Sequence, residues 1–168
     1  MTVRRMIIIA TMITIVVALE QLMAVLPNIQ LTVVLLMVFI SVLNLPESLI
    51  LVLIYTILDN IIGGISVYFI PMLAAWSIFA VIVYMIKNNF KRLIWFGSLF
   101  PLLYTIFLGV PYIIINSLDP LGYFIADIPF TAIFIVNNLL TIAWFYPILQ
   151  KTLVKVIGGK YENLHETR

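Results

Sequence analysis

Three carboxylic acids, Glu20, Asp59 and Asp127, lie within or at the edge of long apolar stretches of this sequence. Because burial of a charge is costly, a carboxyl group at such a position must be neutral, paired or in contact with a wet cavity. Asp59 and Asp127 could act together as catalytic carboxylates, but no Lys or Arg beside them would bind a phosphate group. The sequence favours binding of a solute over catalysis, and it leaves the role of Glu20 open.

The residue types that most enzymes and metal sites need are scarce. The sequence has no Cys and one His, His165, close to the C-terminus. This excludes a cysteine nucleophile, a thiolate metal site, and a His-based triad or zinc site at membrane depth. The P-loop, G-x-S-x-G and H-E-x-x-H motifs are also missing. We therefore expect a protein that is not an enzyme and that binds no cofactor and no metal.

The elements that must position the three acids are membrane-spanning helices. Of the 168 residues, 64% are hydrophobic and 10% are charged, whereas about 25% of the residues in a soluble domain are charged. A helix needs roughly 20 residues to cross a hydrocarbon core of about 30 Å. The chain therefore has room for about six or seven spans and no soluble domain. The composition excludes a disordered chain, a disulfide scaffold and a nucleic-acid-binding protein.

The basic residues predict how many spans there are. They fall into three clusters, at 1–5, 87–92 and 151–168, and such clusters mark the cytoplasmic side. An even number of spans must therefore separate successive clusters, and the polar interruptions fit four and then two. We predict a single all-α transmembrane domain over 1–168 with both termini cytoplasmic and a polar tail at 160–168. Its six helices are expected at 6–26, 31–45, 46–62, 69–86, 93–115 and 123–150.

Two of these helices, 31–45 and 46–62, are short for a span and should be buried against neighbours or meet thinned lipid.

On this topology the three acids lie towards the extracellular side, with amide and Tyr side chains in or beside the outer loops. This asymmetry predicts a polar pocket that opens outwards. The candidate substrate-binding residues are Asn28, Gln30, Asp59, Asn60, Tyr68, Trp76, Tyr123, Asp127 and Asn137.

Structural explanations compete with binding at several of these positions. Asp59 and Asn60 could cap the end of a helix, with Gly63 and Gly64 completing the turn. Asp127 could cap the start of the last helix, beside the positive end of its dipole. Tyr residues at span ends are typical of the aromatic belt at a membrane interface.

The first predicted helix also carries small residues at a spacing of four, Ala10, Thr14 and Ala18. This spacing places them on one helix face, where another helix can approach closely. The partner could be another protein or a helix of the same bundle.

Taken together, these features resemble the substrate-binding (S) subunits of energy-coupling factor (ECF) transporters, the micronutrient importers of bacteria and archaea. Ala10-x-x-x-Thr14-x-x-x-Ala18 is similar to the A-x-x-x-A surface of that family, with Thr in place of one Ala. The runs Leu26–Thr32 and Leu58–Asn60 are similar to the first outer loop and to the end of helix three. Ile128-Pro129-Phe130 with Asn137 is similar to the last helix, although Thr131 and Phe134 stand where a polar or His position often falls.

The resemblance implies a multi-pass protein of a prokaryotic plasma membrane that captures a vitamin or related micronutrient from outside. A transmembrane coupling subunit, meeting Ala10, Thr14 and Ala18, and two ATP-binding subunits would then deliver the solute. A flavin, a cobalamin or another vitamin precursor would suit the amides, acids and aromatic rings. The lack of Lys and Arg in the outer half argues against a strongly anionic solute. The alternative is a small structural membrane scaffold of the cell-wall elongation (MreD-like) type.

Overall fold

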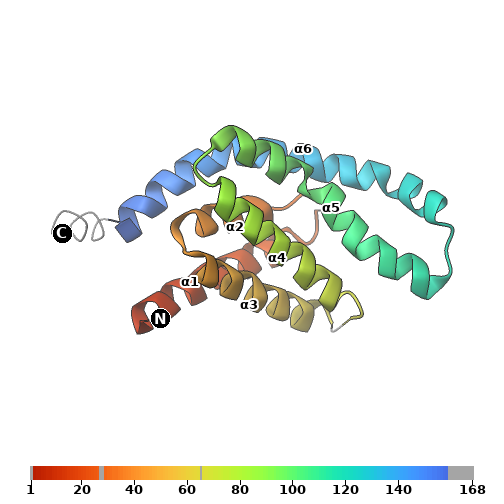
Figure 1. Ribbon diagram of the computed structural model, residues 1–168, viewed down its shortest axis with the longest axis horizontal. Coiled ribbons are helices and arrows are strands. Elements are labelled where there is room, and N and C mark those ends of the chain that lie inside the picture. Colours follow the sequence, from red (N-terminus) through yellow and green to blue (C-terminus); the bar gives the residue numbers. More distant parts are fainter. Residues whose placement is uncertain (1, 27–28, 65, 159–168) are drawn as a thin grey trace.

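The structure, a computed structural model, describes residues 2–26, 29–64 and 66–158. Within these ranges the regular secondary structure is entirely helical, as the sequence predicts. The six helices are α1 (Val3–Met23), α2 (Thr32–Val42), α3 (Leu45–Gly63), α4 (Phe69–Ile86), α5 (Phe90–Asn116) and α6 (Pro120–Gly158). They alternate in direction, so that the start of α1 and the end of α6 lie on the same side of the molecule (Figure 1).

Local signals explain where α3 begins and ends. The side chain of Asn44 accepts a hydrogen bond from the backbone N–H of Glu47 at 2.9 Å, and the Glu47 carboxylate accepts one from the backbone N–H of Asn44 at 3.3 Å. This reciprocal arrangement satisfies two N–H groups at the helix start. Pro46 lies in the first turn, where it loses no helical hydrogen bond. The helix is followed by Gly64, whose φ of 93° is readily adopted only by glycine.

The second helix leaves the expected number of spans unconfirmed. We predicted that 31–45 crosses the membrane, but α2 has 11 residues. It is therefore about 16 Å long, roughly half the thickness of a hydrocarbon core. The other five helices are long and apolar enough to cross a membrane. The described residues thus provide five candidate spans and one short apolar helix.

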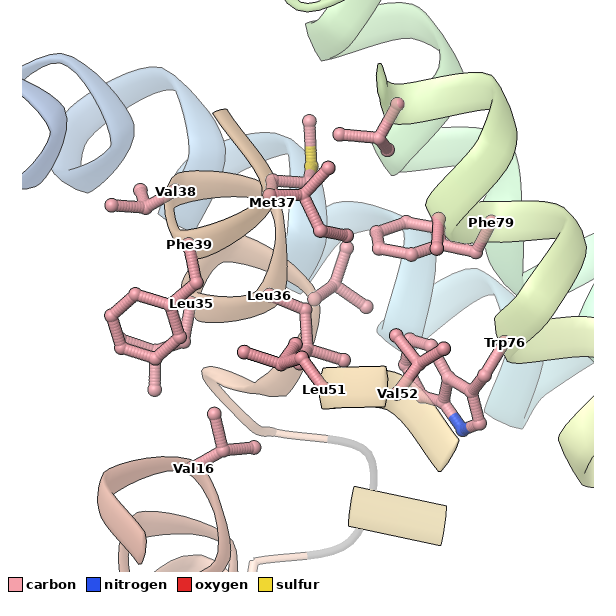
Figure 2. Packing of buried hydrophobic residues seen from close by; sticks show 14 of the residues in the cluster. Val16, Leu35, Leu36, Met37, Val38, Phe39, Leu51, Val52, Trp76 and Phe79 are labelled. Atoms are coloured by element: carbon pink, nitrogen blue, oxygen red, sulfur yellow. The ribbon is translucent and has the colours of Figure 1, made fainter. Parts of the chain in front are cut away.

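The short helix α2 forms the centre of the hydrophobic core. Nine consecutive residues, Thr32 to Ile40, are buried, and α2 contacts all five other helices. Burial on every side explains why this helix is apolar all round. Figure 2 shows side chains of α1, α3 and α4 packed around it, namely Val16, Leu51, Val52, Trp76 and Phe79.

The last two helices form the longest hairpin of the molecule. α6 has 39 residues and α5 has 27, and they extend beyond the other helices on the side away from the start of α1 (Figure 1). We expected α6 to end at residue 150, and it continues to Gly158. Each of the two helices contains two internal prolines, which transmembrane helices tolerate because neighbouring groups satisfy the freed carbonyls.

The basic residues of the described chain gather at one end of the bundle, which we call the basic end. They occupy the start of α1, the link between α4 and α5 with the first turn of α5, and the last turns of α6. Two contacts connect helices there. The guanidinium of Arg5 pairs with the Glu47 carboxylate at 2.6 Å, and the Lys87 ammonium donates to the carbonyl of Leu43 at 3.3 Å. The opposite end is called the far end.

Candidate functional site

Two of the three acids lie close together between α1 and α3. The hydroxyl of Tyr55 donates to Glu20 Oε1 at 3.0 Å, and Tyr55 is only 1% exposed. The other carboxyl oxygen, Glu20 Oε2, is buried without a hydrogen bond of ordinary geometry in the described chain, although the Thr32 hydroxyl interacts with the same carboxyl group. Asp59, one turn beyond Tyr55 on α3, interacts electrostatically with Glu20. Glu20 therefore belongs to the same group of polar side chains as Asp59.

Trp76 is the centre of an aromatic cluster beside these acids. Its ring centroid lies 5.5 Å from that of Tyr55 in an edge-to-face arrangement and 5.7 Å from that of Tyr104. The indole nitrogen is buried without a hydrogen bond of ordinary geometry, although it is near enough to Tyr104 to interact with its hydroxyl. The hydroxyl of Thr32 is also buried without a hydrogen bond of ordinary geometry, although it interacts with the Glu20 carboxyl group. Such atoms are costly to bury unsatisfied and are available to a ligand.

The third acid, Asp127, forms a separate network between α5 and α6. Its Oδ2 accepts a hydrogen bond from the hydroxyl of Thr105 at 3.2 Å and another from the hydroxyl of Thr131. The proposed capping role of Asp127 is wrong, because α6 begins at Pro120, a full two turns earlier. Asp119 caps the start of α6 instead, since its carboxylate accepts a hydrogen bond from the backbone N–H of Gly122 at 2.6 Å.

A hollow of about 180 Å³ lies beside Asp127. Its walls are mainly aromatic, and Tyr104 connects it to the Trp76 cluster. A second hollow, of about 560 Å³, also borders Asp127 and has mainly aliphatic walls from the same two helices. The smaller hollow is lined by Tyr104, Thr105, Leu108, Tyr123, Asp127, Phe130, Thr131 and Phe134.

Two predicted amide side chains have internal partners. Asn60 is buried and donates to the carbonyl of Thr56 at 2.9 Å and to the sulfur of Met72 at 3.3 Å. Asn137 donates to the backbone carbonyl of Gln30 at 2.7 Å, which ties α6 to the segment before α2. Gln30 therefore contributes its backbone to this contact, and both amides support the fold around the acids.

The remaining candidates lie at the far end or beyond the described ranges. Tyr68 packs near Tyr112, with ring centroids 6.2 Å apart, and Tyr112 packs near Tyr123 at 5.5 Å. These three rings cover the region where α4 and α6 begin and α5 ends. Asn28 lies outside the described residues. In sum, the structure groups Asp59 with Trp76, and Asp127 with Tyr123.

The small residues of α1 face away from the bundle. Ala10, Thr14 and Ala18 are all exposed, whereas the buried side of α1 consists of Ile9, Met12, Ile13 and Val16. The Thr14 hydroxyl donates to the carbonyl of Ala10 at 2.9 Å, so its polar group is satisfied within the helix. The small residues therefore do not pack within this bundle, which was one of the two explanations of their spacing.

The site contains side chains that the sequence did not single out, chiefly Tyr55, Tyr104 and Thr105. Tyr55 is four residues before Asp59, and Thr131 is four residues after Asp127. Residues four apart share one face of a helix, so this spacing was the available signal. Tyr104 and Thr105 follow an internal proline of α5, and their neighbours across the bundle depend on tertiary packing.

Among the described residues there is no group of three or more His, Cys, Asp or Glu side chains that could hold a metal ion. The arrangement instead offers hydrogen-bonding groups, carboxyl groups and ring faces inside an apolar bundle. No protein-family model matches the chain, and no curated protein and no solved structure is similar enough to count as a match.

Proposed function

We propose that the chain is the membrane-embedded substrate-binding subunit of an ECF-type importer. It captures a vitamin or related micronutrient outside the cell and delivers it with a coupling subunit and two ATPases. One observation carries the proposal: a carboxyl group is gathered with hydroxyl and indole groups between the helices, away from the basic end. Glu20 Oε2, Thr32 Oγ1 and Trp76 Nε1 are buried there without a hydrogen bond of ordinary geometry, although Thr32 interacts with Glu20 and Trp76 with Tyr104. Ser98, Asn138 and Tyr146 have buried atoms of the same kind, and what distinguishes this group from them is its carboxyl group, which is costly to place inside an apolar bundle.

The distribution of charge supports an outward-facing site. Basic residues near span ends favour the cytoplasmic side of the membrane, and those of the described chain gather at the basic end. In a prokaryotic plasma membrane, the far end then faces the outside. Asp127 and Tyr123, near the start of α6, are on this side of the protein. A solute arriving from outside thus meets the hollow beside Asp127 before it meets the Trp76 cluster.

The size of the hollow limits what it can hold. Pockets for drug-sized molecules are typically about 300–1,000 Å³, and this hollow measures about 180 Å³. It accommodates one ring or one charged group of a solute. A complete vitamin would require α5 and α6 to separate, or would leave part of the molecule outside the hollow.

The exposed face of α1 supports association with a second membrane protein. Small side chains allow two transmembrane helices to approach closely, and Ala10, Thr14 and Ala18 are not covered by the chain's own helices. A coupling subunit that docks there would leave the polar groups on the buried side of α1 and α3 undisturbed. Solute binding and complex formation should therefore be separable by mutation.

The test is a gentle pull-down of the tagged protein from its own host, with co-purified proteins identified by mass spectrometry. We expect one transmembrane coupling subunit and two ATPases. Ala10→Leu and Ala18→Leu should abolish their recovery because the added side chains separate the helices. Ala126→Leu, which adds the same side chain at an exposed position of α6 and leaves α1 unchanged, is the matched control and should retain them. Recovery of cell-wall elongation proteins without ATPases would contradict the proposal and favour the scaffold.

A further inference from the structure

We propose that the captured solute is an organic cation whose ammonium-type group enters the hollow between α5 and α6. In this arrangement Asp127 provides the counter-charge, and Tyr104 and Tyr123 provide aromatic walls. This inference rests on the proposed solute-binding function and adds the chemical class of the solute.

The residues that line the hollow favour a cation as its occupant. Four of its eight lining residues are aromatic, and the only charged one among them is Asp127. A cation placed over the face of an aromatic ring is attracted by the electrons of that ring, and substituted ammonium groups are recognised in this way by aromatic cages. An anionic solute would face the carboxylate of Asp127 with no basic side chain in the lining.

The charges in the half of the bundle nearer the far end, which we call the far half, also favour a cation. In the described ranges, no basic side chain lies within ion-pair distance of Glu20, Asp59 or Asp127. Glu20 and Asp59 both act electrostatically on Tyr104, which forms a wall of the hollow. Glu20 and Asp59 are thus connected through Tyr104 to the hollow that Asp127 lines, and none of the three acids has a compensating cation in the described chain. A bound cation would compensate the charge of the carboxylates, since buried charges need a partner.

The hollow identifies the region as a ligand site and not merely a group of acids. Trp76 is 2% exposed, and its indole N–H is buried beside Tyr104 without a hydrogen bond of ordinary geometry. An inorganic divalent ion is a poorer occupant. Such ions require about six or more oxygen ligands, and the described residues provide no group of three potential metal-binding side chains. Aromatic walls and a volume of about 180 Å³ suit a small organic cation.

The experiment compares two probes of the same shape that differ in charge. Choline carries a quaternary ammonium group, and 3,3-dimethylbutan-1-ol replaces that nitrogen with carbon. Titration calorimetry of the purified full chain in detergent should show at least tenfold tighter binding of choline. Asp127→Asn should weaken choline binding at least tenfold. The matched control is Asp119→Asn, which removes a nearby exposed charge and retains a side-chain acceptor for the helix start; it should bind choline like the unmodified protein.

A second pair of variants tests the aromatic wall. Tyr104→Leu should weaken choline binding more than Tyr104→Phe, because Phe keeps a ring face beside the cation. Unfolding temperatures identify which variants are folded. Equal binding of the two probes, no binding of choline, or unchanged affinity in a folded Asp127→Asn variant would each overturn the inference.

The outcome is distinguishable from that of the importer proposal. If a coupling subunit and ATPases co-purify but the charged and uncharged probes bind equally, the cation inference fails and the importer proposal stands. If choline binds selectively but no ATPases co-purify, the importer proposal fails and the charge preference of the hollow stands.

Discussion

The hydrogen bond between Tyr55 and Glu20 allows a quantitative test of the buried polar site. Tyr55 is 1% exposed, and its hydroxyl lies 3.0 Å from Glu20 Oε1. Tyr55→Phe removes this hydrogen bond and leaves the carboxyl group with only its interaction with the Thr32 hydroxyl. A buried polar group deprived of its partner costs about 1–3 kcal/mol. We expect a loss of this size in the free energy of unfolding.

The measurement is equilibrium unfolding in mixed micelles, monitored by tryptophan fluorescence. A double-mutant cycle with Glu20→Leu isolates the interaction between the two side chains, because Leu offers no acceptor to the Tyr55 hydroxyl, and we expect a coupling free energy of at least about 1 kcal/mol. Tyr112→Phe is the matched control. Its hydroxyl makes no hydrogen bond within the described part of the chain, and Tyr112 is 39% exposed; it should change stability by less than about 0.5 kcal/mol. A coupling energy near zero would refute the assignment of Glu20 to a buried site.

Three further predictions concern packing, capping and orientation. Gly97→Ala should destabilise the protein by about 1–3 kcal/mol, because the added Cβ would lie 2.5 Å from a side-chain atom of α6; Gly63→Ala, with nothing within 4 Å, should be close to neutral in the same unfolding assay. Asn44→Ala should cost about 1 kcal/mol through loss of the capping interaction, measured by thermal unfolding. Since the sequence has no Cys, Ser66→Cys should react with a membrane-impermeant maleimide on intact cells, and Asn88→Cys should react only after lysis; the reverse pattern would contradict an outward-facing far end.

Helix positions were predictable where local chemistry determines them. The break before α3 follows from Asn44 and Pro46, which act on their own backbone and so leave a signal in the sequence. The length of α2 was not predictable, because the apolar residues between 31 and 45 have the same composition whether or not they are helical. Its short predicted length did indicate burial against neighbours or contact with thinned lipid, and the structure confirms the burial.

Several individual residues of the site were predictable, but which of them lie together was not. Asp59 and Asp127 were recognisable because a carboxyl group is costly to bury, so that its presence in an apolar stretch indicates a specific role. Their partners Tyr104 and Thr105 come from α5, and only tertiary packing brings them close. Asp127 was also open to interpretation as a helix cap, because the start of α6 depends on the link at Asp119 and Pro120. An error of two turns in a helix start is enough to change the role assigned to an acid.

The central claim is that the chain holds a small organic solute among the polar groups of its far half. The most direct test is to extract the protein gently from its native membrane, denature it and identify the released small molecules by mass spectrometry. Asp127→Asn and Asp119→Asn are purified in parallel. The account predicts one organic compound at about one per chain, retained by Asp119→Asn and depleted in Asp127→Asn. If no compound distinguishes the unmodified protein from a folded Asp127→Asn variant, the far half does not bind a solute and the account is contradicted.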